Sequence, residues 1–159
     1  MILVTLGTQD KQFTRLLDCV EEAIEKGIIQ EEVIAQIGQT PYQSRNMKCF
    51  SFLDSADFDA YLEKARVVIS HGGVGTISKA VSLMKPVIAC PRLEKYGEHH
   101  NDHQIQIIEK LSEAGSLIPM WKTEDLENCL KQAEDFFPRP IESNNEHFRS
   151  VIKNYIDSL

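Results

Sequence analysis

The stretch from Val67 to Gln104, VVISHGGVGTISKAVSLMKPVIACPRLEKYGEHHNDHQ, decides the fold of this protein. It opens with the apolar run 67–69, which is typical of a buried strand in a parallel sheet because helices cover both faces of such a sheet. A glycine-rich turn follows at 70–76, and apolar residues recur at helical spacing from Ile77 onward. The stretch therefore predicts a strand, a glycine turn and a helix in direct succession.

A glycine turn that leads into a helix is suited to binding a phosphate group. Glycine lets the backbone approach a ligand closely and adopt positive φ angles. The N-terminus of a helix offers N–H groups without intrahelical partners and the positive end of the helix dipole. Because Gly72, Gly73 and Gly75 all lie in this turn, we expect an anion site there.

The second half of the stretch brings polar residues to the same edge of the sheet. Lys85-Pro86 ends the helix, residues 87–90 form the next apolar strand, and a polar loop runs from Pro91 to Gln104. In open α/β sheets, ligands bind at the edge where the carboxyl ends of the strands lie. We therefore expect the loop and the glycine turn to face one ligand.

The rest of the chain repeats the pattern of strand, turn and helix. An apolar run at 2–6 ends at Gly7-Thr8, and a helical stripe follows from Phe13 to Ile24. Further strands are expected at 33–37, 49–53 and 116–118, and further helical stripes at 58–65, 105–111, 126–137 and about 145–159. This alternation predicts an α/β fold in one domain over residues 1–159: a doubly wound, mostly parallel sheet of about six strands with an amphipathic C-terminal helix.

Composition and charge exclude several classes of function. The chain has 159 residues, 42% of them apolar, which suffices for the core of one domain. A net charge of −7 opposes nucleic acid or an anionic membrane as the main partner. The apolar runs are too short for a signal peptide or a membrane span, so we expect a cytoplasmic protein. The four cysteines lack CxxC spacing and are predicted to be reduced.

Three motifs in a fixed order resemble one enzyme family. They are residues 4–8 (VTLGT), residues 70–76 (SHGGVGT), and the loop from Pro91-Arg92 to Gln104. Together they resemble the C-terminal, donor-binding domain of glycosyltransferase family 28, which has the GT-B fold. Within that family the chain is most similar to small bacterial subunits of exopolysaccharide and capsule assembly, and to the catalytic subunit of the dolichol-pathway UDP-N-acetylglucosamine transferase.

The resemblance implies a Rossmann-like half of a GT-B enzyme, because a complete GT-B enzyme has two such domains. A membrane-associated partner subunit would bind the lipid-linked saccharide acceptor and recruit this chain to the inner face of the membrane. This chain would bind the UDP-sugar, and the heteromer would transfer a hexose with inversion at the anomeric carbon. The resemblance implies neither a cofactor nor a metal ion.

The family motifs also imply roles for individual residues. The residues expected to contact the diphosphate are Gly7, Thr8, Gly72, Gly73, Gly75 and Thr76. Glu98, His103 and Gln104 would bind sugar hydroxyls. His71 is the best local candidate for a catalytic contact, while the main general base is expected on the partner.

One position departs from the family pattern. Better-known members carry, four residues after the position of Gly75, a glutamate that binds the ribose hydroxyls, and here that residue is Lys79. A lysine cannot accept those hydrogen bonds. The ribose must then be held differently, or Lys79 pairs with a phosphate.

Two patterns, one rich in histidine and one acidic, resemble metal-binding motifs. We predict that neither of them binds a metal ion. His99 and His103 are spaced as metal ligands on a helix, but a polar set for sugar hydroxyls explains this loop equally well. Asp57-Phe58-Asp59 imitates the Asp-x-Asp motif of metal-dependent glycosyltransferases. It lies in the first turn of a predicted helix, where acidic residues favour the dipole.

Two other functions stay open at this point. A non-catalytic nucleotide-sugar-binding module or sensor is compatible with the missing ribose glutamate. A fragment of a dinucleotide-dependent oxidoreductase is disfavoured, because no Gly-x-Gly-x-x-Gly follows the first strand.

Overall fold

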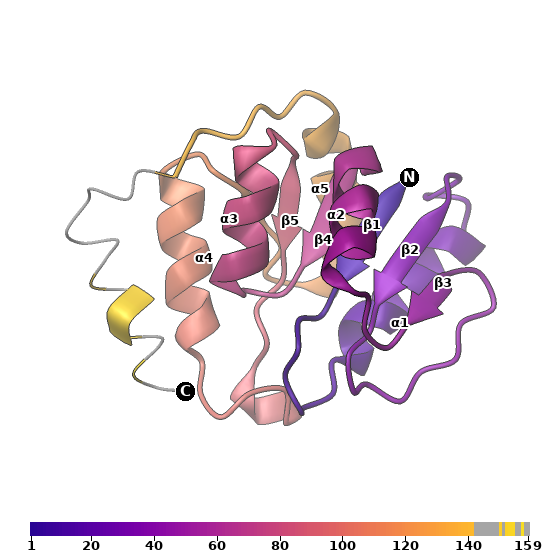
Figure 1. Ribbon diagram of the computed structural model, residues 1–159, viewed down its shortest axis with the longest axis horizontal. Helices are drawn as coiled ribbons and strands as arrows, with labels where there is room; N and C mark the ends of the chain where they lie inside the picture. Colours follow the sequence, from indigo (N-terminus) through magenta and orange to yellow (C-terminus); the bar gives the residue numbers. More distant parts are fainter. Residues whose placement is uncertain (142–149, 151, 155–156, 158–159) are drawn as a thin grey trace.

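The computed structural model describes residues 1–141, 150, 152–154 and 157, and its centre is a six-stranded parallel sheet (Figure 1). The strands are β1 (Ile2–Thr5), β2 (Val33–Gln36), β3 (Lys48–Phe50), β4 (Val67–Ser70), β5 (Val87–Ala89) and β6 (Ile118–Pro119). Their order is β3-β2-β1-β4-β5-β6, and every neighbouring pair is parallel. The expected doubly wound sheet of about six strands is confirmed.

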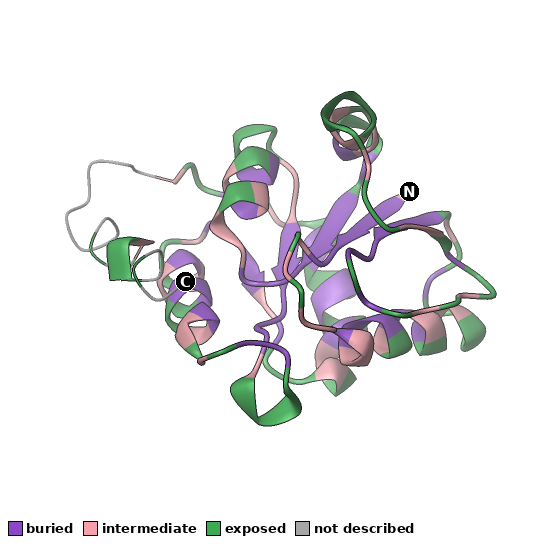
Figure 2. Ribbon diagram, turned by 60° about the horizontal axis from the view of Figure 1, so that its bottom comes forward, coloured by how far each residue is buried: buried purple, intermediate pink, exposed green. Residues whose placement is uncertain are grey.

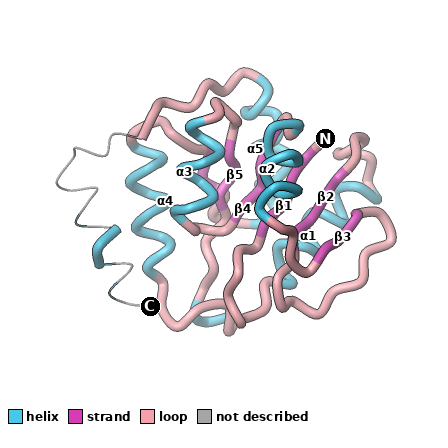
Figure 3. The backbone as a smooth tube through the Cα atoms, viewed as in Figure 1, coloured by secondary structure: helices cyan, strands magenta, loops and turns pink. Residues whose placement is uncertain are grey.

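Helices cover both faces of the sheet, as a parallel sheet requires. They are α1 (Thr14–Glu25), α2 (Ser55–Lys64), α3 (Val74–Ser82), α4 (His103–Glu113) and α5 (Leu126–Glu134), with short 3-10 helices at Glu94–Tyr96 and Thr123–Asp125. Helices α2, α3 and α4 lie in front of the sheet in Figures 1 and 3, and α1 and α5 lie behind it.

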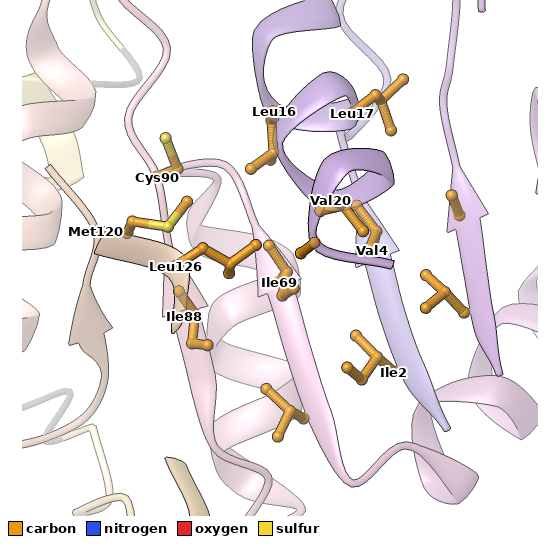
Figure 4. Close-up of a cluster of buried hydrophobic side chains, with 14 of the residues drawn as sticks. Ile2, Val4, Leu16, Leu17, Val20, Ile69, Ile88, Cys90, Met120 and Leu126 are labelled. Atoms are coloured by element: carbon orange, nitrogen blue, oxygen red, sulfur yellow. The ribbon is translucent and has the colours of Figure 1, made fainter. Parts of the chain in front are cut away.

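The two faces of the sheet carry separate hydrophobic clusters. Val4 of β1 packs in the cluster that contains α1 and α5, whereas its neighbour Leu3 packs in the cluster that contains α3 and α4. Figure 4 shows the first cluster, in which Leu16, Leu17 and Val20 of α1 lie over the strands. Both faces are thus buried, while the outer sides of the helices stay exposed (Figure 2).

The connection between β2 and β3 contains no helix. Residues 37–47 cross in an irregular path, and Tyr42 and Met47 pack against the cluster on the α1 side. These contacts hold the loop against the sheet, in a connection between parallel strands that is usually formed by a helix. The third strand is shorter than expected and ends at Phe50.

Helix α4 begins earlier than the sequence suggests. The side chain of Asn101 accepts a hydrogen bond from the backbone N–H of His103 at 3.0 Å, and the helix starts at that residue. Gln104 therefore lies on the buried face of α4, together with Ile107 and Ile108, instead of ending a loop. Ile105, the first residue of the expected stripe, is only half-buried.

The amphipathic helix expected at about 145–159 lies for the most part outside the described residues. In the part of the chain that the structure describes, no helix has the length and apolar character needed to cross a membrane.

Candidate functional site

A cleft of about 740 Å³ opens at the carboxyl ends of β1, β2 and β4. The described residues that line it come from the end of β2, from the segments that follow β1, β3 and β4, from α2 and α3, and from the C-terminal segment: Gly7, Thr8, Gln9, Gln36, Phe52, Leu53, Ser55, Phe58, Asp59, His71, Gly73, Val74, Gly75, Thr76, Lys79 and Ile152. Seven of the residues expected at the site are among them. The other four, Gly72, Glu98, His103 and Gln104, do not line the cleft.

The N-terminus of α3 faces this cleft without a cap. Gly73 is the N-cap residue and has no side chain to bond the free backbone groups. The first intrahelical bond runs from the N–H of Ile77 to the carbonyl of Gly73, at 3.3 Å. The N–H groups that precede it, at Val74, Gly75 and Thr76, are therefore available to a ligand, at the positive end of the dipole.

His71 lies between the two glycine turns. A Cβ at Gly7 would be 2.4 Å from Nε2 of His71, and a Cβ at Gly73 would be 2.3 Å from Cε1. Both distances are far inside contact distance, so a side chain at either glycine would collide with the imidazole. Gly7 also has a φ of 73°, which favours glycine.

Gln104 supports this arrangement from α4. Its Oε1 accepts hydrogen bonds from the backbone N–H groups of Gly72 and Arg92, each at 2.9 Å, and its Nε2 lies 3.0 Å from Nδ1 of His71. A Cβ at Gly72 would be 2.6 Å from Cβ of Gln104. Both the oxygen and the nitrogen of the Gln104 amide, expected to bind sugar hydroxyls, thus have partners inside the protein.

His71 is neutral in the folded protein. Its burial, followed by the positive charge of Arg92 and the proximity of His99, lowers its pKa from 6.5 to about 3. A histidine with such a low pKa is a weak general base at neutral pH.

Glu98 is also turned inward. Its side chain is 1% exposed, and its two oxygens accept hydrogen bonds from Nη2 and Nε of Arg15 at 2.9 and 3.1 Å. The backbone N–H of Leu93 donates to the same carboxylate at 3.1 Å. The carboxylate expected to bind the sugar therefore joins α1 to the loop after β5.

Arg92 has a scaffolding role that sequence reasoning missed. Its guanidinium is buried and donates to backbone carbonyls of Leu6, Lys11 and Glu98, and it stacks 5.0 Å from the ring centre of Phe13. It holds the turn after β1 against the loop after β5. The Pro-Arg pair after an apolar strand is the only sequence signal for it.

His103, the first residue of α4, has a buried side-chain nitrogen. Its ring nitrogen Nδ1 is buried and has no hydrogen-bond partner among the described residues. Of the three side chains expected to bind sugar, it is thus the one with unused hydrogen-bonding capacity. Within the same described part of the chain, no group of histidine, cysteine or acidic residues has the arrangement needed for a metal ion.

Lys79 is paired with Asp59 across the mouth of the cleft. Its Nζ forms an ion pair with a carboxylate oxygen of Asp59, which reaches over from α2. Both residues line the cleft. A carboxylate is therefore present beside the position where the family has its glutamate, although it comes from another helix.

Comparisons with known proteins agree with this architecture. The chain is 27% identical over 143 residues to the UDP-N-acetylglucosamine transferase subunit ALG13 of Debaryomyces hansenii, covering 81% of this chain and 65% of that protein. The chain thus spans just under two thirds of that relative.

Solved structures share the fold. An NMR solution structure of ALG13 matches with a TM-score of 0.58 at 22% identity, over 96% of this chain and 94% of that one. The glycotransferase of kitacinnamycin matches with a TM-score of 0.62 at 17% identity, over 96% and 37%. The sequence pattern of the glycosyltransferase family 28 C-terminal domain matches residues 1–158, and the chain belongs to that family.

Proposed function

We propose that this chain binds a UDP-sugar and is the donor-binding catalytic subunit of a heteromeric, inverting hexosyltransferase. The observation that carries the proposal is the cleft itself, where the uncapped N-terminus of α3 and the turn at Gly7-Thr8 face the same space. Backbone N–H groups and a helix dipole stabilise the negative charge that a departing UDP acquires, without a metal ion.

Asp59 supplies a carboxylate for the ribose in this proposal. A carboxylate can accept hydrogen bonds from two neighbouring hydroxyls, which Lys79 cannot do. Lys79 holds Asp59 at the cleft through their ion pair and leaves carboxylate lone pairs for the ligand. Thr76 and Thr8, which also line the cleft, add hydroxyl donors for the phosphates.

The cleft lacks a strong general base, which supports a second subunit. Among the described residues that line it, Asp59 and His71 are the only side chains of a type that can serve as a general base, and Asp59 is paired with Lys79. The low pKa of His71 makes it a poor acceptor. A base from a membrane-associated partner, which also binds the acceptor, completes the site.

The relative ALG13 carries the word subunit in its own name, and this supports a heteromer. We also propose a lipid-linked saccharide of exopolysaccharide or capsule biosynthesis as the acceptor to test first. We place the chain in the cytoplasm, recruited to the inner face of the membrane by that partner, as a single domain over residues 1–159.

A non-catalytic nucleotide-sugar-binding module is the alternative function. The weakness of His71 as a base favours it, because the chain then binds the donor without performing chemistry. Transfer activity in the presence of the partner distinguishes the two functions.

The test is calorimetry of the chain with UDP, UDP-sugars and NAD, followed by a transfer assay with the membrane partner. We expect UDP to bind and NAD not to bind, and Thr76→Val to weaken UDP binding about tenfold through the loss of one hydrogen bond to a charged group. Ser82→Ala, at the far end of α3, serves as the control and should bind UDP normally. Binding of NAD but not UDP would refute the proposal, and binding of UDP-sugar without turnover in the heteromer would establish the alternative.

A further inference from the structure

The orientation of the Gln104 side-chain amide is fixed by the backbone around it. Two backbone N–H groups, of Gly72 and Arg92, point at Oε1 from 2.9 Å. Both are obligatory donors, so the atom between them must be the amide oxygen. The other end of the amide, which lies 3.0 Å from Nδ1 of His71, is therefore the NH₂ group.

This orientation determines the tautomer of His71. An amide NH₂ group donates and does not accept, so Nδ1 of His71 has to accept. In a neutral imidazole the proton then resides on the other nitrogen, Nε2. If Nδ1 were protonated, its N–H would face the NH₂ group of Gln104, and two hydrogen-bond donors would be in contact without an acceptor.

Nε2 is the nitrogen that faces the candidate phosphate site. It lies within 2.5 Å of the Cβ positions that Gly7 and Gly73 lack, and these two glycines and His71 line the cleft together. Among the described residues it forms no hydrogen bond with the protein. The group presented to a ligand between the two turns is thus an N–H donor.

We propose that Gln104 is a positioning residue that holds His71 as the neutral Nε2–H tautomer, so that His71 donates a hydrogen bond to an oxygen of the diphosphate. The identity of that acceptor rests on the proposed function. In this state Nε2 has no lone pair in the ring plane with which to take a proton from the acceptor hydroxyl. His71 stabilises the leaving group and does not act as a general base.

The surroundings of His71 keep this tautomer uncharged. The charged or titratable groups that act on His71 are Arg92, from the loop after β5, and His99, and the pKa of His71 is also lowered by its burial. The hydrogen bond with Gln104 raises the pKa of His71, but by less than the burial of the ring lowers it.

The test uses the full chain with ¹⁵N-labelled histidine. Two-bond ¹⁵N–¹H correlations distinguish a protonated ring nitrogen from an unprotonated one. We expect the His71 signals to show a protonated Nε2 and an unprotonated Nδ1 from about pH 5 to about pH 8. A protonated Nδ1, or titration of His71 within this range, would overturn the proposal.

Gln104→Glu is the decisive variant, because it keeps the size of the side chain and one oxygen for the two backbone donors. Its second oxygen accepts where the amide donated, so the proton of His71 should move to Nδ1. UDP affinity should then fall roughly tenfold at about pH 8, where a lone pair faces the diphosphate, and recover as falling pH produces the imidazolium. An unaltered tautomer, or unaltered UDP affinity at both pH values, would contradict the proposal.

The two readouts separate this inference from the function on which it rests. The tautomer is measured in the ligand-free chain, so this measurement tests it independently of UDP binding. Suppose that the unmodified chain shows the expected tautomer but does not bind UDP. The proposed function is then refuted, and so is the role of His71 toward a diphosphate. The hydrogen bond from Gln104 to His71 is still confirmed.

Discussion

The Cα atom of Gly73 lies directly against the imidazole of His71. A Cβ on this glycine would be 2.3 Å from Cε1 and 2.5 Å from Nε2. The sequence suggested that glycines in this turn leave space for phosphates, and at this position the space is occupied by a side chain of the same protein. A substitution here acts first on the fold and only then on a ligand.

Gly73→Ala and Gly75→Ala should therefore behave differently. We expect the first to lower the free energy of unfolding by about 1–3 kcal/mol, because the new methyl group displaces a packed ring. A Cβ at Gly75 meets nothing within 4 Å, so that variant should keep its stability or gain up to about 1 kcal/mol from better helix propensity. Urea denaturation measures both, and equal losses would refute the packing explanation.

Loss of Arg15 should destabilise the protein strongly. Arg15→Met leaves the buried carboxylate of Glu98 with a single backbone donor, and breaking such a pair costs about 3 kcal/mol. Lys26→Met removes an exposed pair with Glu22 and should cost no more than about 0.5 kcal/mol. Similar costs in the two variants would show that the Glu98 pair is not a structural contact.

The pair of Asp59 and Lys79 should matter for the ribose. If Asp59 binds the ribose hydroxyls, Asp59→Asn should weaken UDP binding about tenfold and reduce the preference for UDP over 2′,3′-dideoxy-UDP. Asp57→Asn, two residues away on the same helix, is the matched control because Asp57 does not line the cleft. An undiminished preference in Asp59→Asn would remove this residue from the ribose site. Calorimetry with the two nucleotides gives the answer.

The stability of the protein should fall in acid because of His71. Its folded pKa of about 3 lies below the ordinary value of 6.5, so the unfolded chain binds a proton that the folded chain does not. The free energy of unfolding should then decrease as the pH falls below about 6.5, by up to about 1.4 kcal/mol per pH unit. Above that pH the contribution is complete and constant.

Urea denaturation at about pH 5 and about pH 8 checks this slope. His71→Gln should remove the share of the slope that His71 contributes, while His100→Gln, at an exposed position, should retain it. An identical slope in His71→Gln and the unmodified chain would show that His71 is not held neutral by folding.

The arrangement of the sheet was accessible from sequence because it depends on local patterns. Apolar runs such as Val67-Val68-Ile69 are typical of strands that helices cover on both faces of a parallel sheet, and glycines after two of these runs mark the edge where such sheets bind ligands. The uncapped start of α3 follows from the same local pattern. These features need no knowledge of distant contacts.

Tertiary structure alone decided which polar side chains face the cleft. Glu98 and Gln104 are residue types that suit a sugar site, but the Glu98 carboxylate is bonded to Arg15 on α1 and the Gln104 amide oxygen to the backbone N–H of Gly72. Asp59 resembled an ordinary acidic residue in a first helical turn, and its place beside Lys79 depends on how α2 packs next to α3. A sequence specifies which hydrogen-bond donors and acceptors a chain contains. Their partners are determined by contacts between residues that lie far apart in the chain, and no local sequence pattern encodes these contacts.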